Sequence, residues 1–142
     1  MARQVVDKGK RRFDRWIRDR KKDASHVIVV GIIKPRTYST GAQLLEIAKA
    51  HEFGTQMIPE RSFLRAWADE AAQEIRQRFE SIEKADTNAY ERIGAWAAGQ
   101  VQARISRGIL PANHPKTIAK KGSSTPLIDT GLLRSSITWK VQ

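Results

Sequence analysis

The side chains that most often carry catalysis or bind metals are few in this chain and lie far apart. Its 142 residues include no cysteine and three histidines, His26, His51 and His114. Metal-binding histidines usually stand about four residues apart on a helix or flank a short loop, and these three do neither. We therefore expect no thiol chemistry, no metal and no cofactor.

Nucleophiles and phosphate-binding loops are also missing from the sequence pattern. Serine pairs occur at 123–124 and 135–136, but neither lies in the strand–turn–helix setting of a nucleophile elbow. Gly31 stands alone in its apolar run, so it does not belong to a glycine-rich phosphate loop. Carboxylates tend to have a basic residue four positions on, as Glu74 has Arg78, which is typical of surface pairs on helices. The sequence therefore predicts a protein that is not an enzyme.

The composition indicates one globular domain. Hydrophobic residues make up 40% of the chain and charged residues 29%, which are ordinary proportions for a globular protein. No apolar run approaches the ~20 residues that span a bilayer, and the first residues lack the apolar stretch of a signal peptide. We expect a protein without a membrane partner, made in the cytoplasm and used there or in a particle assembled there.

Positive charge is concentrated near the start of the chain. The formal net charge is +11, and residues 1–22 hold ten basic and three acidic residues. The cations that we expect to contact a partner from this segment are Lys8, Arg11, Arg12, Arg15, Arg18 and Lys22. A cationic end of this kind fits a polyanion such as DNA or an acidic protein surface, although a basic helix that is merely solvated has the same composition.

The first half of the chain predicts a helix, a strand and two further helices. Residues 3–22 read as a basic helix with a narrow apolar stripe. Residues 26–33 are β-branched and almost wholly apolar, which predicts a strand buried on both faces. A short amphipathic helix should cover 42–52, and a long one should run over 62–84 with Ser62 as its N-cap.

The second half predicts another long helix and a final strand. The helix should run over 88–107, where Asn88 and Glu91 have the spacing of a capping box. Small residues in its first half let another element approach closely: Gly94, Ala95, Ala98 and Gly99. We expect a loop arm at 109–128, with one helical turn at 117–121, then a short helical turn capped by Asp129 and a strand at 135–141.

These elements predict an α+β fold. It would have a small antiparallel or mixed sheet, two long helices forming a helical hairpin, and a basic N-terminal helix. We divide the chain into an N-terminal arm at 1–24 and a single domain at 25–142.

Two segments, 51–65 and 117–141, carry distinctive motifs. The first reads "EFGT…IP-R-F-R" through Glu52, Phe53, Gly54, Thr55, Ile58, Pro59, Arg61, Phe63, Leu64 and Arg65. The second reads "A-KG…PL-DTG-L--SI" through Ala119, Lys121, Gly122, Pro126, Leu127, Asp129, Thr130, Gly131, Leu133, Ser135 and Ile137. In this order they resemble the small neck proteins of tailed bacteriophages, known as tail-completion, head–tail connector, virion-morphogenesis or minor tail proteins. The resemblance spans most of 26–142, and the long basic helix before it is more pronounced than the family pattern.

The resemblance implies a structural protein of the virion that works by assembly. Such a protein would form a closed ring in the neck, with a hexamer as the first expectation and a dodecamer as the alternative. Its neighbours would be other neck, adaptor, tail-terminator and tail-tube proteins, and DNA would pass through the ring. The basic helix would then line the channel and contact the genomic DNA without reading its sequence, or bind an acidic surface of an adjoining ring.

Several motif residues have an interface-like composition. An aromatic residue with flanking arginines suggests that Arg61, Phe63 and Arg65 face a neighbouring subunit. The full set of predicted interface residues is Phe53, Arg61, Phe63, Arg65, Lys116, Lys120, Lys121 and Leu127. The alternative interpretation is that these residues define turns and anchor the core.

Two other classes of function remain as alternatives. A free DNA-binding protein would use the basic helix for sequence-independent binding, but the sequence has no helix-turn-helix spacing, zinc finger or aromatic RNA-binding strand. A small nuclease or a cell-wall-degrading enzyme would need a convergent cluster of histidines or carboxylates, which the sequence does not display.

Overall fold

The computed structural model describes residue 15 and residues 26–34, 36–38, 41–83, 86, 88–121 and 131–142. The elements in this part of the chain are β1 (Ile28–Ile32), α2 (Leu44–Phe53), α3 (Arg65–Glu70), α4 (Ala72–Glu80), α5 (Ala89–Arg107), α6 (Pro115–Lys121), α7 (Leu132–Ser136) and β2 (Ile137–Val141). Two antiparallel strands with several helices confirm the predicted α+β class. The predicted helix at 3–22 lies outside the described residues, except for Arg15, which is exposed and in helical conformation.

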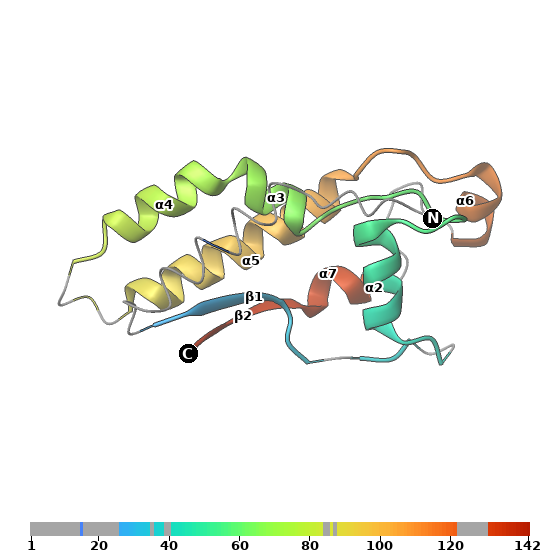
Figure 1. The fold of residues 1–142 in the computed structure, drawn as a ribbon. Helices are drawn as coiled ribbons and strands as arrows, with labels where there is room; N and C mark the ends of the chain where they lie inside the picture. Colours follow the sequence, from blue (N-terminus) through green and yellow to red (C-terminus); the bar gives the residue numbers. More distant parts are fainter. Residues whose placement is uncertain are drawn as a thin grey trace.

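The long helix α5 lies at the centre of the molecule (Figure 1). The two strands run along one side of α5, and α3 and α4 run along the other, so that the chain reverses direction between α4 and α5. This arrangement matches the expected helical hairpin. The helices α2 and α6 lie toward the end of the molecule that is opposite to the C-terminus, and α7, nearer the middle, contacts α2. Among the described residues, no helix combines the length and the apolar character needed to cross a bilayer.

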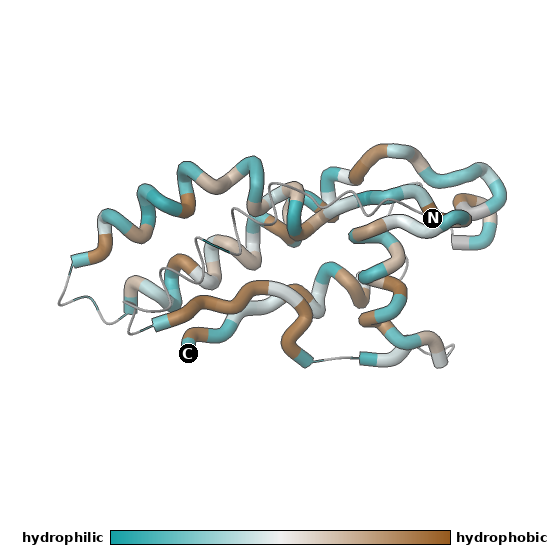
Figure 2. The backbone as a smooth tube through the Cα atoms, viewed as in Figure 1, coloured by the Kyte–Doolittle hydropathy of each residue, from teal (hydrophilic) through white to brown (hydrophobic). Residues whose placement is uncertain are grey.

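The sheet consists of β1 and β2, paired from Ile28 with Val141 to Ile32 with Ile137. The sequence placed both strands correctly, but full burial of the first strand on both faces was a wrong prediction, because Val29 is 38% exposed. One face of β1 packs on the core through Val30 and Ile32. On the other face Val29 is exposed, whereas Gly31 is buried, and a Cβ atom there would lie 3.6 Å from Cδ2 of Leu64. Figure 2 shows the hydrophobic residues along this strand, interrupted by one residue of intermediate hydropathy.

The predicted helix over 62–84 is divided in the structure. At Ala71 the backbone departs from helical geometry (φ −88°, ψ 1°), which separates α3 from α4, and α4 ends at Glu80. Ala71 still donates its N–H to the carbonyl of Trp67 at 2.8 Å, so the helical hydrogen bonding of α3 extends to the distorted residue. Trp67 of α3 is buried, whereas no residue of α4 is. The long amphipathic pattern therefore covers a well-packed first turn and a loosely packed remainder.

The core forms where α5 meets α2, α7 and the start of α3. Its buried residues are Leu44, Ala48, Phe63, Trp67, Ala97, Ala98, Val101, Ile105, Leu133 and Ile137. The small residues predicted to admit a close neighbour do so at Gly94, where a Cβ atom would lie 2.7 Å from Cγ of Trp139 on β2. The face of α5 that carries Val101 and Ile105 is fully buried, as its periodicity predicted.

The segment after α5 is more ordered than the sequence suggested. Residues 115–121 form α6, where we expected a loop with one turn at 117–121. The rest of the predicted arm, 122–128, and the cap predicted at Asp129 lie outside the described residues. The final strand begins at Ile137, because residues 135 and 136 complete α7.

Candidate interaction surface and the polar junction beneath it

The side chain of Glu52, at the end of α2, is the centre of a buried polar cluster. Glu52 is 6% exposed. Its Oε2 accepts the backbone N–H of Phe63 at 2.9 Å and of Leu64 at 3.1 Å, and its Oε1 accepts that of Arg65 at 2.9 Å. The hydroxyl of Ser62 also donates to Oε1, at 2.8 Å. The first amides of a helix lack partners within the helix, so a carboxylate from α2 caps the start of α3.

Arg65 binds the same carboxylate and covers an aromatic ring. Its Nε donates to Oε1 of Glu52 at 3.2 Å, and its Nη2 donates to the Glu52 carbonyl and to Oε1 of Glu60, both at 2.9 Å. The guanidinium lies 4.5 Å from the centroid of the Phe53 ring. Phe53 itself is 57% exposed. Phe53 and Arg65, which were each predicted as interface residues, thus contact each other at the surface, and the hydrogen bonds to Glu52 and Glu60 hold the arginine in place.

Arg61 connects this region to the loop that follows α5. Its Nε donates to the carbonyl of Pro111 at 2.7 Å, and its Nη2 donates to that of Ala112 at 3.2 Å. Its backbone N–H donates to the carbonyl of His51 at 2.7 Å. Burial, which leaves Arg61 only 5% exposed, lowers the pKa of its guanidinium. A planar guanidinium can hold two successive carbonyls in this way, whereas an ammonium group cannot match the geometry.

Arg104 ties the cluster to α5. Its Nε donates to the carbonyl of Ser62 at 3.3 Å, and its Nη1 binds Oε2 of Glu70 at 2.7 Å. We call the set formed by Glu52, Arg61, Ser62, Arg65 and Arg104 the polar junction. It joins α2, α3, α5 and the loop at 108–114.

The loop between α2 and α3 is held by its own turn. Gly54 has φ 70°, a backbone conformation that strains residues with a side chain. A Cβ atom there would also lie only 3.0 Å from the backbone nitrogen of Glu60, so both conformation and space favour glycine. Thr55 donates its N–H to the carbonyl of Ile58 at 2.8 Å, and its Oγ1 accepts the N–H of Ile58 at 2.9 Å. This turn leaves the side chain of Met57 91% exposed.

Three exposed apolar side chains therefore stand on backbone that the junction or its turns fix in place. They are Phe53, Met57 and Leu110, which are 57%, 91% and 83% exposed. Leu110 precedes the carbonyl that Arg61 binds. We call these three residues the apolar end surface, because α2 and the loops at 54–64 and 108–114 lie at the same end of the molecule (Figure 1).

The structure separates the predicted interface residues into two groups. Phe53 and Arg65 contact each other at the surface, and Lys116 and Lys120 are exposed on α6. The prediction that Arg61 and Phe63 face a neighbouring subunit is wrong, because they are 5% and 3% exposed. Both serve the alternative role, Phe63 in the core and Arg61 as a clamp on a loop. The side chain of Lys121 and all of Leu127 lie outside the described residues, as do Lys8, Arg11, Arg12, Arg18 and Lys22.

The sequence reasoning missed the role of Glu52. A capping carboxylate is normally recognised because it precedes or begins the helix that it caps. Glu52 lies eleven residues before Phe63 and on another helix, so no local pattern marks it. The only available signal was its place in the first family motif.

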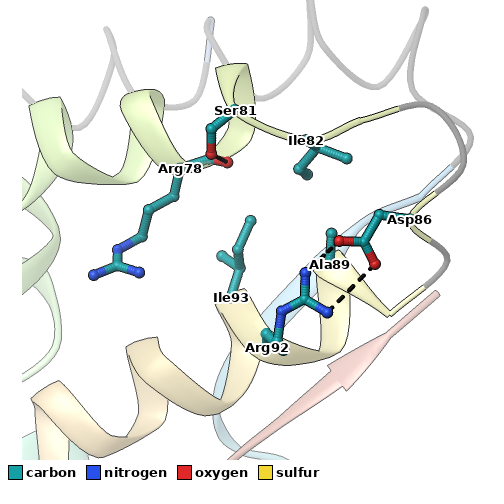
Figure 3. Close-up of a pocket in the computed structure, with 7 residues that line it drawn as sticks. All are labelled: Arg78, Ser81, Ile82, Asp86, Ala89, Arg92 and Ile93. Atoms are coloured by element: carbon teal, nitrogen blue, oxygen red, sulfur yellow. Dashed lines mark hydrogen bonds and ion pairs between the residues drawn. The ribbon is translucent and has the colours of Figure 1, made fainter.

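A hollow lies between α4 and α5 (Figure 3). It has a volume of about 230 Å³ and is lined by Arg78, Ser81, Ile82, Asp86, Ala89, Arg92 and Ile93. Its charged groups already have partners: Arg92 binds Asp86, and Arg78 binds Glu74 at 2.7 Å. Among the described residues, its lining has one carboxylate and no histidine, so these side chains form no acid–base pair.

The pair of Asp86 and Arg92 replaces the capping box predicted at the start of α5. The side chain of Asn88 makes no capping hydrogen bond. Instead, Oδ1 of Asp86 accepts the N–H of Asn88 at 3.2 Å. The hydrogen bond from Arg92 lowers the pKa of Asp86, and the same bond raises the pKa of Arg92.

Within the described ranges, no three histidine, aspartate or glutamate side chains come close enough together to hold a metal ion. The chain matches no family model, no curated protein and no solved structure.

Proposed function

We propose that this chain is a structural protein of a tailed-phage virion, a tail-completion or head–tail connector subunit that forms a ring in the neck. One observation carries the proposal. The residues of 51–65 that resemble the phage neck proteins are the residues that build the polar junction and its exposed edge, through Glu52, Phe53, Arg61 and Arg65.

The proposal is supported by what the junction does to its surroundings. It holds two loops that are far apart in sequence: Arg61 binds two carbonyls of the loop at 108–114, and Arg65 binds Glu60 at the end of the loop at 54–60. Rigid loops lose little conformational freedom on binding, which favours association. A protein that must dock repeatedly onto identical neighbours benefits from such a preorganised surface.

The apolar end surface supports an assembly role for the same end. Large apolar side chains that are mostly exposed mark interaction sites when they gather at one place and stand on fixed backbone. Phe53, Met57 and Leu110 are exposed on segments that lie at the same end of the molecule, and Lys116 and Lys120 of α6 are exposed polar groups of the kind found at an interface rim. We assign this end to contacts with neighbouring virion proteins.

The experiment is to measure the mass of the purified protein by light scattering, alone and with tails isolated from the phage that encodes it. Electron microscopy of the same mixtures shows where the protein attaches. We expect a ring at the head-proximal end of the tail. A double variant, Met57→Ser with Leu110→Ser, should reduce attachment while leaving the fold intact, because both side chains are already exposed.

The matched control is Gln77→Ser on the exposed side of α4, which should attach like the unmodified protein. A chain that ignores tails but binds duplex DNA tightly by itself would contradict the proposal. That outcome would favour the free DNA-binding protein and would assign function to the cations at 1–22.

A further inference from the structure

The hydrogen bonds of the two-stranded sheet define which backbone groups point away from it. Val27 and Gln142 exchange both bonds, N–H to carbonyl at 2.7 and 2.8 Å. In an antiparallel pair, residues that exchange bonds alternate with residues whose N–H and C=O point outward. With the observed register, the backbone groups of Ile28, Val30 and Ile32 therefore point away from β2.

This outer edge of β1 is unpaired among the described residues, since the only strand bonded to β1 is β2. Natural edge strands are usually guarded by a lysine, a proline or a bulge. The stretch 27–33 has no charged residue and no proline, and its pairing with β2 runs without a bulge. Val29 is also 38% exposed on this strand. An unguarded apolar edge is the kind that accepts another strand.

The other edge of the sheet belongs to β2. The outward carbonyl of Ile137 accepts a hydrogen bond from Nε2 of Gln102 on α5 at 2.9 Å, which closes one end of that edge. By the same alternation, the outward groups of Trp139 and Val141 have no backbone partner among the described residues. The chain therefore has two open edges on one sheet, on strands of equal length.

We propose that the outer edge of β1 in one copy pairs with the outer edge of β2 in the next copy, so that the sheet continues from subunit to subunit around the ring. This inference rests on the proposed function and names the contact that closes the ring. A heterologous contact of this kind closes into a ring when a whole number of equal rotations completes a full turn without translation along the axis. If the axis runs nearly along the strands, β2 and the neighbouring β1 are antiparallel, as they are within one copy.

A second copy fits these edges better than another partner does. Pairing between copies satisfies both edges with the same interaction, whereas any single foreign strand leaves one edge open. The two strands carry one charged residue between them, Lys140, so no like charges are placed opposite each other. A two-stranded sheet is also small for independent stability, and continuation enlarges it.

Amide hydrogen exchange resolved by residue tests the contact. In the monomer, the N–H groups of Ile28, Val30, Trp139 and Val141 should exchange quickly, whereas that of Val29, which bonds within the subunit, should exchange slowly. In the ring formed with tails, all five should be slow, with protection of the first four raised by at least about a hundredfold.

Each outcome decides the inference separately from the proposed function. If a ring forms and the four edge amides stay unprotected, edge pairing is overturned while the connector role stands. Protection of Ile28 and Val30 alone, with a dimeric mass, would mean that β1 pairs with itself, which also overturns it. A protein that neither attaches to tails nor self-associates fails on both.

A variant pair gives an independent test. Proline at position 28 removes an outward N–H and leaves the bonds to β2 intact, which edge strands tolerate. We expect Ile28→Pro to form rings at least about tenfold less readily than Ile28→Ala, which loses the side chain but keeps the amide. Equal ring formation by the two variants, with the monomer fold intact in both, would overturn the proposal.

Discussion

The side chain of Glu52 belongs to α2 but accepts hydrogen bonds from three backbone amides at the start of α3. The Glu52 side chain is only 6% exposed, so the amides that it binds have little access to water if the carboxylate is changed. Glu52→Gln keeps the size of the side chain but turns one acceptor into a donor that faces N–H groups. We expect it to lower the free energy of unfolding by about 3 kcal/mol, measured by urea denaturation.

The control for this variant is on the same helix. Glu46 is exposed and binds only Lys49, three residues away at 3.0 Å. Glu46→Gln makes the same chemical change without removing a buried acceptor, so we expect a loss of less than about 0.5 kcal/mol. Equal losses for the two variants would mean that the cap on α3 does not stabilise the fold.

Asp86 gives a prediction about pH. Its pKa is lowered first by the hydrogen bond from Arg92 and further by the charge of that guanidinium. A lowered folded-state pKa stabilises the fold at pH values above the unfolded value, and this contribution disappears as the pH falls through the folded value. Carbon-detected NMR titration should place the Asp86 midpoint below 3.8, and Arg92→Gln should move it back toward 3.8. A midpoint that does not respond to the variant would exclude the pair as the cause.

At the scale of elements, Gly94 and Gly99 offer a test within one helix. A Cβ atom at 94 would lie 2.7 Å from Cγ and 3.1 Å from Cβ of Trp139, atoms that cannot move without the whole side chain, whereas at 99 it would meet nothing within 4 Å. Gly94→Ala should therefore destabilise the protein by about 1–2 kcal/mol, the overpacking cost less the gain in helix propensity. Gly99→Ala should be neutral or stabilise it by up to about 1 kcal/mol. Denaturation midpoints check both, and a stabilised Gly94→Ala would show that Trp139 has room to move.

The elements that the sequence placed best are those whose pattern and packing agree. The periodic apolar face of α5 is the buried face, and both strands lie where their β-branched runs predicted. The break at Ala71 and the early end of α4 were not predictable, because alanine favours helix and the apolar spacing continues through Ile75 and Phe79. These residues are only partly buried, so periodicity alone overstated how firmly this helix packs.

The strand at 26–33 shows a second limit of sequence patterns. A continuous apolar run usually means burial on both faces, yet β1 has one neighbour in the sheet and leaves Val29 exposed. The run therefore indicates the strand conformation correctly, but it does not show how much of each face the rest of the fold covers.

At the scale of the whole molecule, the fold class followed from the order of the elements, but the surface did not. Arg61 and Phe63 have the composition of an interface and lie inside the subunit, because the loop at 108–114 folds over one and the core surrounds the other. No sequence pattern marked Met57 or Leu110 as interface residues, yet they are the most exposed large apolar residues among those described. Exposure depends on contacts between distant segments, which no local pattern encodes.

The net charge of +11 makes opposite predictions for the two candidate functions. Copies of so basic a chain repel each other, and the proposed contact between β1 and β2 contains one charged residue, Lys140. Salt screens repulsion over about 10 Å at 0.1 M, so ring formation should strengthen between about 50 and 300 mM salt. DNA binding should weaken steeply over the same range, because it releases counterions. Sedimentation measures ring formation and fluorescence anisotropy measures DNA binding on the same samples. Rings that dissociate as the salt concentration rises would show that charged contacts, and not strand edges, hold the copies together.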